Sequence, residues 1–183
     1  KLSKRHGALG VEAYRAMGYL PEAMRNYLAR LSWSHGDEEI FSTEQMVEWF
    51  DLDAIGKSAA RFDFAKLENL NGHYIRHMAD DKLLMSFIDF LPHAEGGKAM
   101  AAKIDAAMMP KLLRALPGLK ERAKTLIELK NGAQFLFAER PLAMDEKAQQ
   151  IIKDGGKDVL NSVLPVLEQV TNWQAHDIES AVK

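Results

Sequence analysis

The sequence contains no cysteine, and it lacks the long apolar runs that mark membrane proteins. Without cysteine, the 183-residue chain can form neither a disulfide framework nor a thiolate metal site. No apolar run reaches the roughly 18 residues of a membrane-spanning helix, and no stretch resembles a signal peptide. We therefore expect a soluble, cytoplasmic protein with no membrane partner.

The chain also lacks an excess of charge of either sign. It carries 24 Lys and Arg against 26 Asp and Glu, a formal net charge of −2. This balance gives no global signature of nucleic-acid binding, so any such contact must come from a local patch. With 47% hydrophobic residues, the chain can build a buried core as one large or two small domains.

Apolar residues recur at steps of three and four along most of the chain, and no sustained alternation of period two is present. This pattern predicts a mainly α protein made of several short helices. Pro21 suits a first helical position, Ser42 with Gln45 forms a capping box, and Asp63 is an expected N-cap.

The second half of the chain continues the helical pattern. The spacing of Leu119, Ala123 and Leu126 predicts that all three lie on helix with one shared apolar face. Breaks are expected at Pro92, at Asn131–Gly132 and at Gly155–Gly156, and Pro165 is expected to kink or end the last of these helices. The best internal boundary is a change of composition near Arg140–Pro141.

Two short motifs could indicate phosphate or metal binding. Gly56-Lys57-Ser58 resembles the end of a phosphate loop, but Asp51 stands where that motif needs a glycine, so a solvated loop is favoured. His73 and His77 share a helix face and could hold zinc. No third ligand is evident, which favours two partly exposed surface histidines and no metal site.

Paired carboxylates occur twice, at Asp80–Asp81 and at Glu38–Glu39. Adjacent residues on a helix do not face one another, so neither pair is expected to form an acid–base dyad. Solubility and negative charge at a helix N-terminus are their expected roles.

The first residues, KLSKR, place three cations and a hydroxyl within five positions. Such a cluster could clamp a polyphosphate and stabilise charge as pyrophosphate leaves. On composition alone, a solvated basic arm is the alternative reading.

The residues that follow this cluster indicate its function. KLSKR resembles the lysine-methionine-serine-lysine-serine signature of class I aminoacyl-tRNA synthetases, and the rest of the chain is similar, in order, to glutamyl-tRNA synthetases. The matching segments are LGVEAYRAMGYLPEAMRNYLARLSWS, EEIFSTEQM, FDFAKLENLNGHYIR, ERAKTLIEL and AQFLFAERP with DEKAQ behind it. Together they cover essentially the whole chain.

The resemblance implies a C-terminal portion of a glutamate–tRNA ligase, because in that family the signature follows a Rossmann catalytic fold. The parent enzyme would attach glutamate to tRNA in two ATP-dependent steps, with Mg²⁺ expected beside the ATP. Lys4 matches the signature lysine that contacts ATP, and Lys1 and Ser3 match residues that shape its loop. Leu2 and Arg5 are common variants of the signature. Without the Rossmann fold, the chain alone is expected to be inactive.

Helices in place of barrel strands point to the bacterial type of this family, or to an organellar descendant of it. That type implies a stem-contact domain over residues 1–79, with room for a small strand pair, and a helical anticodon-binding subdomain over 80–140. Residues 141–183 would begin a second helical subdomain that is cut short. Arg122, in ERAKTL, falls where a relative has an arginine that faces the anticodon; a surface helical arginine is the alternative.

The implied partner is a glutamate-accepting tRNA, with no DNA, and a monomer is expected. The sequence leaves open whether a glutamine tRNA is also charged. Two further hypotheses also stand on the sequence: a stand-alone helical RNA-binding module with a basic arm, and a helical scaffold for protein interactions.

Overall fold

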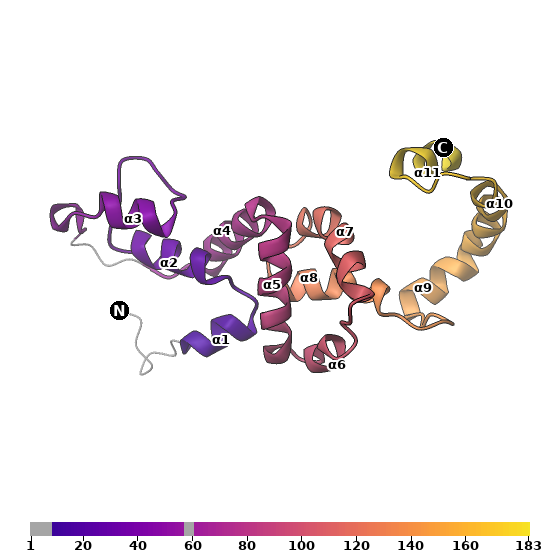
Figure 1. Cartoon of the computed structure of the whole chain (residues 1–183), viewed down its shortest axis with the longest axis horizontal. Helices are drawn as coiled ribbons and strands as arrows, with labels where there is room; N and C mark the ends of the chain where they lie inside the picture. Colours follow the sequence, from indigo (N-terminus) through magenta and orange to yellow (C-terminus); the bar gives the residue numbers. More distant parts are fainter. Residues whose placement is uncertain (1–8, 57–60) are drawn as a thin grey trace. The chain divides into compact units, whose positions relative to one another are not determined.

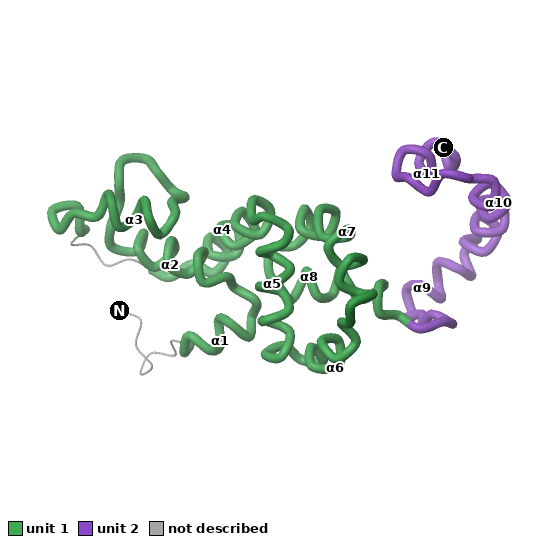
Figure 2. Tube along the Cα trace, in the orientation of Figure 1, with its two compact units in different colours: residues 1–138 green, residues 139–183 purple. Residues whose placement is uncertain are grey.

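The computed structural model of the chain describes residues 9–56 and 61–183. The chain divides into two units, Lys1–Ala138 and Glu139–Lys183 (Figure 2). The boundaries expected from the sequence, after residues 79 and 140, stay predictions about domain roles.

The described residues are mainly helical, as the sequence predicts. They contain no sheet, and the small strand pair for which the family left room is reduced to one isolated bridge between Trp33 and Ile55. The larger helices of the first unit are α1 (Val11–Ala16), α2 (Pro21–Arg30), α3 (Thr43–Trp49), α4 (Phe64–His77), α5 (Asp80–Phe90), α6 (Gly97–Ala101), α7 (Met108–Lys120) and α8 (Leu126–Ala133). Short 3₁₀ turns occupy Leu52–Ala54, Leu91–His93 and Gln134–Leu136. No helix among the described residues is long and apolar enough to cross a membrane.

The expected helix starts are confirmed, each with its physical cause. Pro21 is the first residue of α2, where its missing N–H costs no helical hydrogen bond. Ser42 and Gln45 form the capping box of α3, with each side chain bonded to the other residue's backbone N–H. Asp63 caps α4 by accepting hydrogen bonds from the N–H groups of Ala65 and Lys66.

The main core of the first unit lies where α5 packs against α7 and α8 (Figure 1). Its fully buried members include Phe87 and Leu83 on α5, Leu112 and Leu116 on α7, and Leu129 on α8. Each such side chain stabilises the fold by about 1.5–3 kcal/mol through burial. A smaller cluster of Tyr14, Tyr27, Leu67 and Leu70 joins α1 and α2 to α4.

The second unit consists of α9 (Glu146–Ile151), α10 (Lys157–Glu168) and α11 (Ala175–Val182). The expected break at Gly155–Gly156 is confirmed, because Gly155 has a φ of 100° between α9 and α10. The helix α10 continues past Pro165 and ends at Glu168. No residue of this unit is fully buried, so it is a run of helices without a core of its own.

Candidate functional site

Arg122 lies in the loop of residues 121–125 between α7 and α8, and not on a helix as the apolar spacing predicts. The spacing is misleading here because α7 already ends at Lys120, and a new helix begins after its N-cap, Thr125. Its extended backbone caps α8, and its hydroxyl accepts a hydrogen bond from the N–H of Glu128 at 3.2 Å.

A local signal for this loop was present in the sequence. The letters TLIE place Thr125 three residues before Glu128, which is the pattern of a capping box. In the structure the Glu128 carboxylate accepts a hydrogen bond from the N–H of Lys124 at 2.7 Å. Just before this cap, the N–H groups of Arg122 and Ala123 donate to the carbonyls of Leu119 and Lys120, in a turn that leaves Arg122 exposed and Ala123 buried.

The side chain of Arg122 makes no ion pair or hydrogen bond with any described residue, unlike three lysines near this loop. The ammonium of Lys120 lies 2.6 Å from Asp80, and that of Lys124 lies 3.8 Å from Glu68. Lys130 donates a hydrogen bond to the backbone carbonyl of Glu95. The guanidinium of Arg122 is thus available to a ligand, whereas its neighbours serve the fold.

A hollow of about 280 Å³ lies beside Arg122. Its lining residues include Arg122, Glu128 and Phe135, and Phe135 is 65% exposed. Gly132 also lines it, and a Cβ there would lie 3.2 Å from Leu119 Cδ2. The remaining lining residues are Gly118, Leu119 and Ala123.

This combination of groups suits a planar, hydrogen-bonding ligand. A guanidinium can donate two hydrogen bonds to a base edge or stack on the base, and a carboxylate can accept from an exocyclic amine. An exposed aromatic ring offers a stacking surface. Bases that are not paired in a duplex present both their faces and their edges to such groups.

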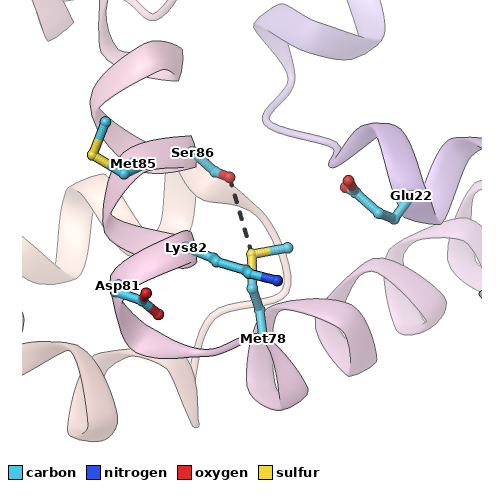
Figure 3. A pocket seen from close by; sticks show the side chains of 6 residues that line it. All are labelled: Glu22, Met78, Asp81, Lys82, Met85 and Ser86. Carbon is cyan, nitrogen blue, oxygen red and sulfur yellow. Dashed lines mark hydrogen bonds between the residues drawn. The ribbon is translucent and has the colours of Figure 1, made fainter.

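A larger hollow, of about 380 Å³, lies between α2 and the start of α5 (Figure 3). It is lined by Glu22 of α2 together with Met78, Asp81, Lys82, Met85 and Ser86. Two carboxylates against one ammonium make it a poor site for a phosphate, since like charges repel. Arg122 is not among its lining residues, so size alone does not identify the site.

The signature residues Lys1, Ser3 and Lys4 lie outside the described residues, as do Lys57 and Ser58 of the phosphate-loop candidate. The predicted contact of Lys4 with ATP, and the predicted roles of Lys1 and Ser3 in shaping the signature loop, therefore stay predictions.

The two histidines of α4 stack on one another, with ring centroids 3.9 Å apart, and His77 Nδ1 lies 2.9 Å from the carbonyl oxygen of His73. Burial lowers the pKa of His73, and the nearby charges of His77 and Arg76 lower it further. Within 9–56 and 61–183, no three His, Asp or Glu side chains gather as a metal site would require.

The carboxylate pairs have separate surroundings. Asp80 and Asp81 lie in the first turn of α5, as expected, and Asp80 also forms an ion pair with Lys120. Glu39 forms an ion pair with Arg30. The Asp80 contact joins residues 40 positions apart, which local sequence patterns could not reveal.

Two family sequence models match the chain. The model described as "Anticodon binding domain" matches residues 82–183, and the model described as "tRNA synthetases class I (E and Q), catalytic domain" matches residues 1–69. The hollow beside Arg122 lies within the first of these stretches, and the signature residues lie within the second.

Proteins with similar sequences are named as glutamate–tRNA ligases. The chain is 60% identical over all 183 residues to "Glutamate--tRNA ligase 2" of Brucella ovis, and 58% identical to "Glutamate--tRNA ligase 1" of Brucella melitensis. It spans 39% of the length of each of these relatives.

Solved structures of similar fold carry the same name. A glutamate tRNA ligase from Elizabethkingia meningosepticum, crystallised with its amino acid, shares 27% identity at a TM-score of 0.68; 90% of this chain matches 31% of that one. A glutamate-tRNA synthetase from Elizabethkingia anophelis shares 29% identity at a TM-score of 0.62, with 90% of this chain matching 30% of that one.

Proposed function

Since the chain belongs to the family of anticodon-binding domains and is homologous to glutamate–tRNA ligases along its whole length, we propose that it is the tRNA-binding part of such a ligase. One observation indicates which residues would contact the tRNA. Within the stretch that matches the anticodon-binding domain, Arg122 has no acidic partner among the described residues and lines a hollow with the exposed ring of Phe135.

The hollow suits an anticodon because anticodon bases are single-stranded. An α-helical unit cannot read bases inside an RNA duplex, but it can hold a splayed base between rigid side chains. We propose that Arg122 contacts the edge of one anticodon base and that Phe135 stacks on it or on its neighbour. Other lysines and arginines would contribute phosphate contacts, which weaken as salt rises.

The roles that we propose for the three segments of the chain are those expected from the sequence. Residues 1–79 would hold the signature loop and contact the tRNA stem, and residues 80–140 would hold the first anticodon-binding subdomain. Residues 141–183 would begin a second one. The family match to a catalytic domain over residues 1–69 supports the first of these assignments.

The whole enzyme would activate glutamate with ATP, aided by Mg²⁺, and transfer it to a glutamate-accepting tRNA in the cytoplasm as a monomer. In that reaction Lys4 would stabilise the negative charge that develops on the phosphates as pyrophosphate leaves, with Lys1 and Ser3 shaping the loop. The signature motif KLSKR supports this proposal.

Direct binding tests the tRNA-binding role. Fluorescence anisotropy with the 183-residue chain should show tighter binding to glutamate tRNA than to the same tRNA with a substituted anticodon, and weaker binding at higher salt. Arg122→Ala and Phe135→Leu should each remove most of the difference between the two tRNAs. Met85→Ala, a change in the larger hollow, should keep it. Equal binding of both tRNAs by the wild-type chain would contradict the proposal.

A further inference from the structure

Asn71 joins three segments that lie far apart in the sequence. It stands on α4 and is 0% exposed. Its Oδ1 accepts a hydrogen bond from the N–H of Leu20 at 2.8 Å, and its Nδ2 donates to the carbonyl of Lys124 at 2.6 Å and to that of Gly18 at 3.4 Å. One amide therefore ties α4 both to the α1–α2 turn and to the loop that carries Arg122.

The same three segments are packed with no spare room. The N–H of Leu126 donates to the Gly18 carbonyl at 2.9 Å, and a Cβ at Gly18 would lie 2.8 Å from the backbone nitrogen of Leu126. On α4, a Cβ at Gly72 would lie 3.3 Å from Lys124 Cα. The backbone of the loop at Lys124 is thus held on two sides.

Arg122 depends on this backbone for its position. Its guanidinium makes no ion pair with any described residue, and it stands only two positions before Lys124. A side chain that reads a ligand must be held to about 0.5 Å, and residues behind it supply that order. The buried amide of Asn71, on α4, contacts the loop backbone directly.

We propose that Asn71 is a positioning residue for anticodon reading, which holds the loop of residues 121–125 so that Arg122 meets a base edge. Through Leu20 and Gly18 the same amide fixes this loop against the part of the chain that matches a catalytic domain. The inference rests on the proposed function of Arg122.

Two asparagines make a matched test. Asn71→Asp keeps the size and one oxygen of the side chain but replaces the donor to Lys124 with a second oxygen. Asn26→Asp makes the same change at a site that is 1% exposed, where the amide donates to the carbonyl of Glu39 at 3.2 Å, away from the loop. Asn71→Ala serves as a second variant if the buried carboxylate prevents folding.

The measurement is anticodon discrimination by the whole ligase, taken as the ratio of kcat/KM for glutamate tRNA to kcat/KM for an anticodon-substituted tRNA. We expect Asn71→Asp to lower this ratio by about threefold or more and Asn26→Asp to leave it within about twofold, although both lower Tm. Arg122→Ala combined with Asn71→Asp should lose no more discrimination than Arg122→Ala alone.

The outcomes separate the two proposals. If Arg122→Ala lowers the ratio and neither Asn71 variant does, the positioning role is wrong and the role of Arg122 stands. If Asn71→Asp and Asn26→Asp lower the ratio alike, Asn71 acts only through general stability, and the inference is also wrong. If Arg122→Ala keeps the wild-type ratio, the proposed function of Arg122 itself fails, and the inference fails with it.

Discussion

The ammonium of Lys120, at the end of α7, lies 2.6 Å from the carboxylate of Asp80, the first residue of α5. It also donates a hydrogen bond to the carbonyl of Met78 at 3.1 Å. The Lys120 side chain is only 15% exposed and that of Asp80 33%, so solvent screens the pair incompletely. The contact fixes the end of α7 where the loop with Arg122 begins.

Lys120→Met should therefore destabilise the first unit by about 1–2 kcal/mol, between the values for exposed and fully buried ion pairs. Urea unfolding of the chain measures this change. Glu68→Gln removes the more exposed and longer contact with Lys124, and it should cost less than about 0.5 kcal/mol. Equal losses in the two variants would contradict the structural role of Lys120.

Gly18 should tolerate no side chain. Its φ of 82° strains any other residue, and a Cβ would lie 2.8 Å from the backbone nitrogens of Leu126 and Ile127. Gly36 also has a positive φ, of 54°, but a Cβ there would meet no atom within 4 Å. In urea unfolding we expect about 1 kcal/mol of destabilisation for Gly36→Ala and at least about twice that for Gly18→Ala. A similar cost at both positions would mean that the close approach at Gly18 is absent.

The stability of the first unit should fall on acidification partly through His73. The pKa of His73 is lowered in the folded chain by burial, then by the charges of His77 and Arg76. The unfolded chain, with a pKa near 6.5, therefore takes up the proton first, and folding weakens as pH falls through and below about 6.5.

Unfolding free energies measured between about pH 7 and pH 5 test this effect. His73→Gln should flatten the decline, and His77→Gln should flatten it less, because burial is the larger cause of the shift. A decline in His73→Gln as steep as that of the wild type would assign it to other groups.

Lys4→Ala in the whole ligase should lower kcat for glutamate activation by about 10²-fold or more, on the scale of one preorganised donor to a transition state. Binding of tRNA should change far less, since the lysine is predicted to face ATP. Steady-state kinetics and tRNA binding of the same variant separate these effects. An activation rate within about threefold of the wild type would leave KLSKR as a solvated basic arm.

Local rules predicted the elements whose causes are local. Pro21, the Ser42–Gln45 box and the Asp63 cap each act within one turn of helix, so the sequence shows them directly. The loop at Arg122 was missed because apolar spacing continues across it, from Leu119 through Ala123 to Leu126, while the cap at Thr125 redirects the backbone.

The candidate site depends on contacts between residues that lie far apart in the sequence. Arg122 makes no ion pair with any described residue, whereas its neighbours Lys120 and Lys124 are paired with Asp80 and Glu68, which lie 40 and 56 positions away. The buried amide of Asn71 reaches across 53 positions to the carbonyl of Lys124. Sequence reasoning could nominate Arg122 through a family resemblance, but only the fold shows what surrounds it.

The anticodon discrimination of Arg122→Ala tests the central claim most directly. The measurement compares kcat/KM of the wild-type and variant ligases on glutamate tRNA and on anticodon-substituted tRNAs. Loss of a base contact should reduce discrimination by about 1–3 kcal/mol, roughly 5- to 150-fold, at one anticodon position. If Arg122→Ala instead weakens all the tRNAs alike and flattens the salt dependence, Arg122 contacts a phosphate and reads no base.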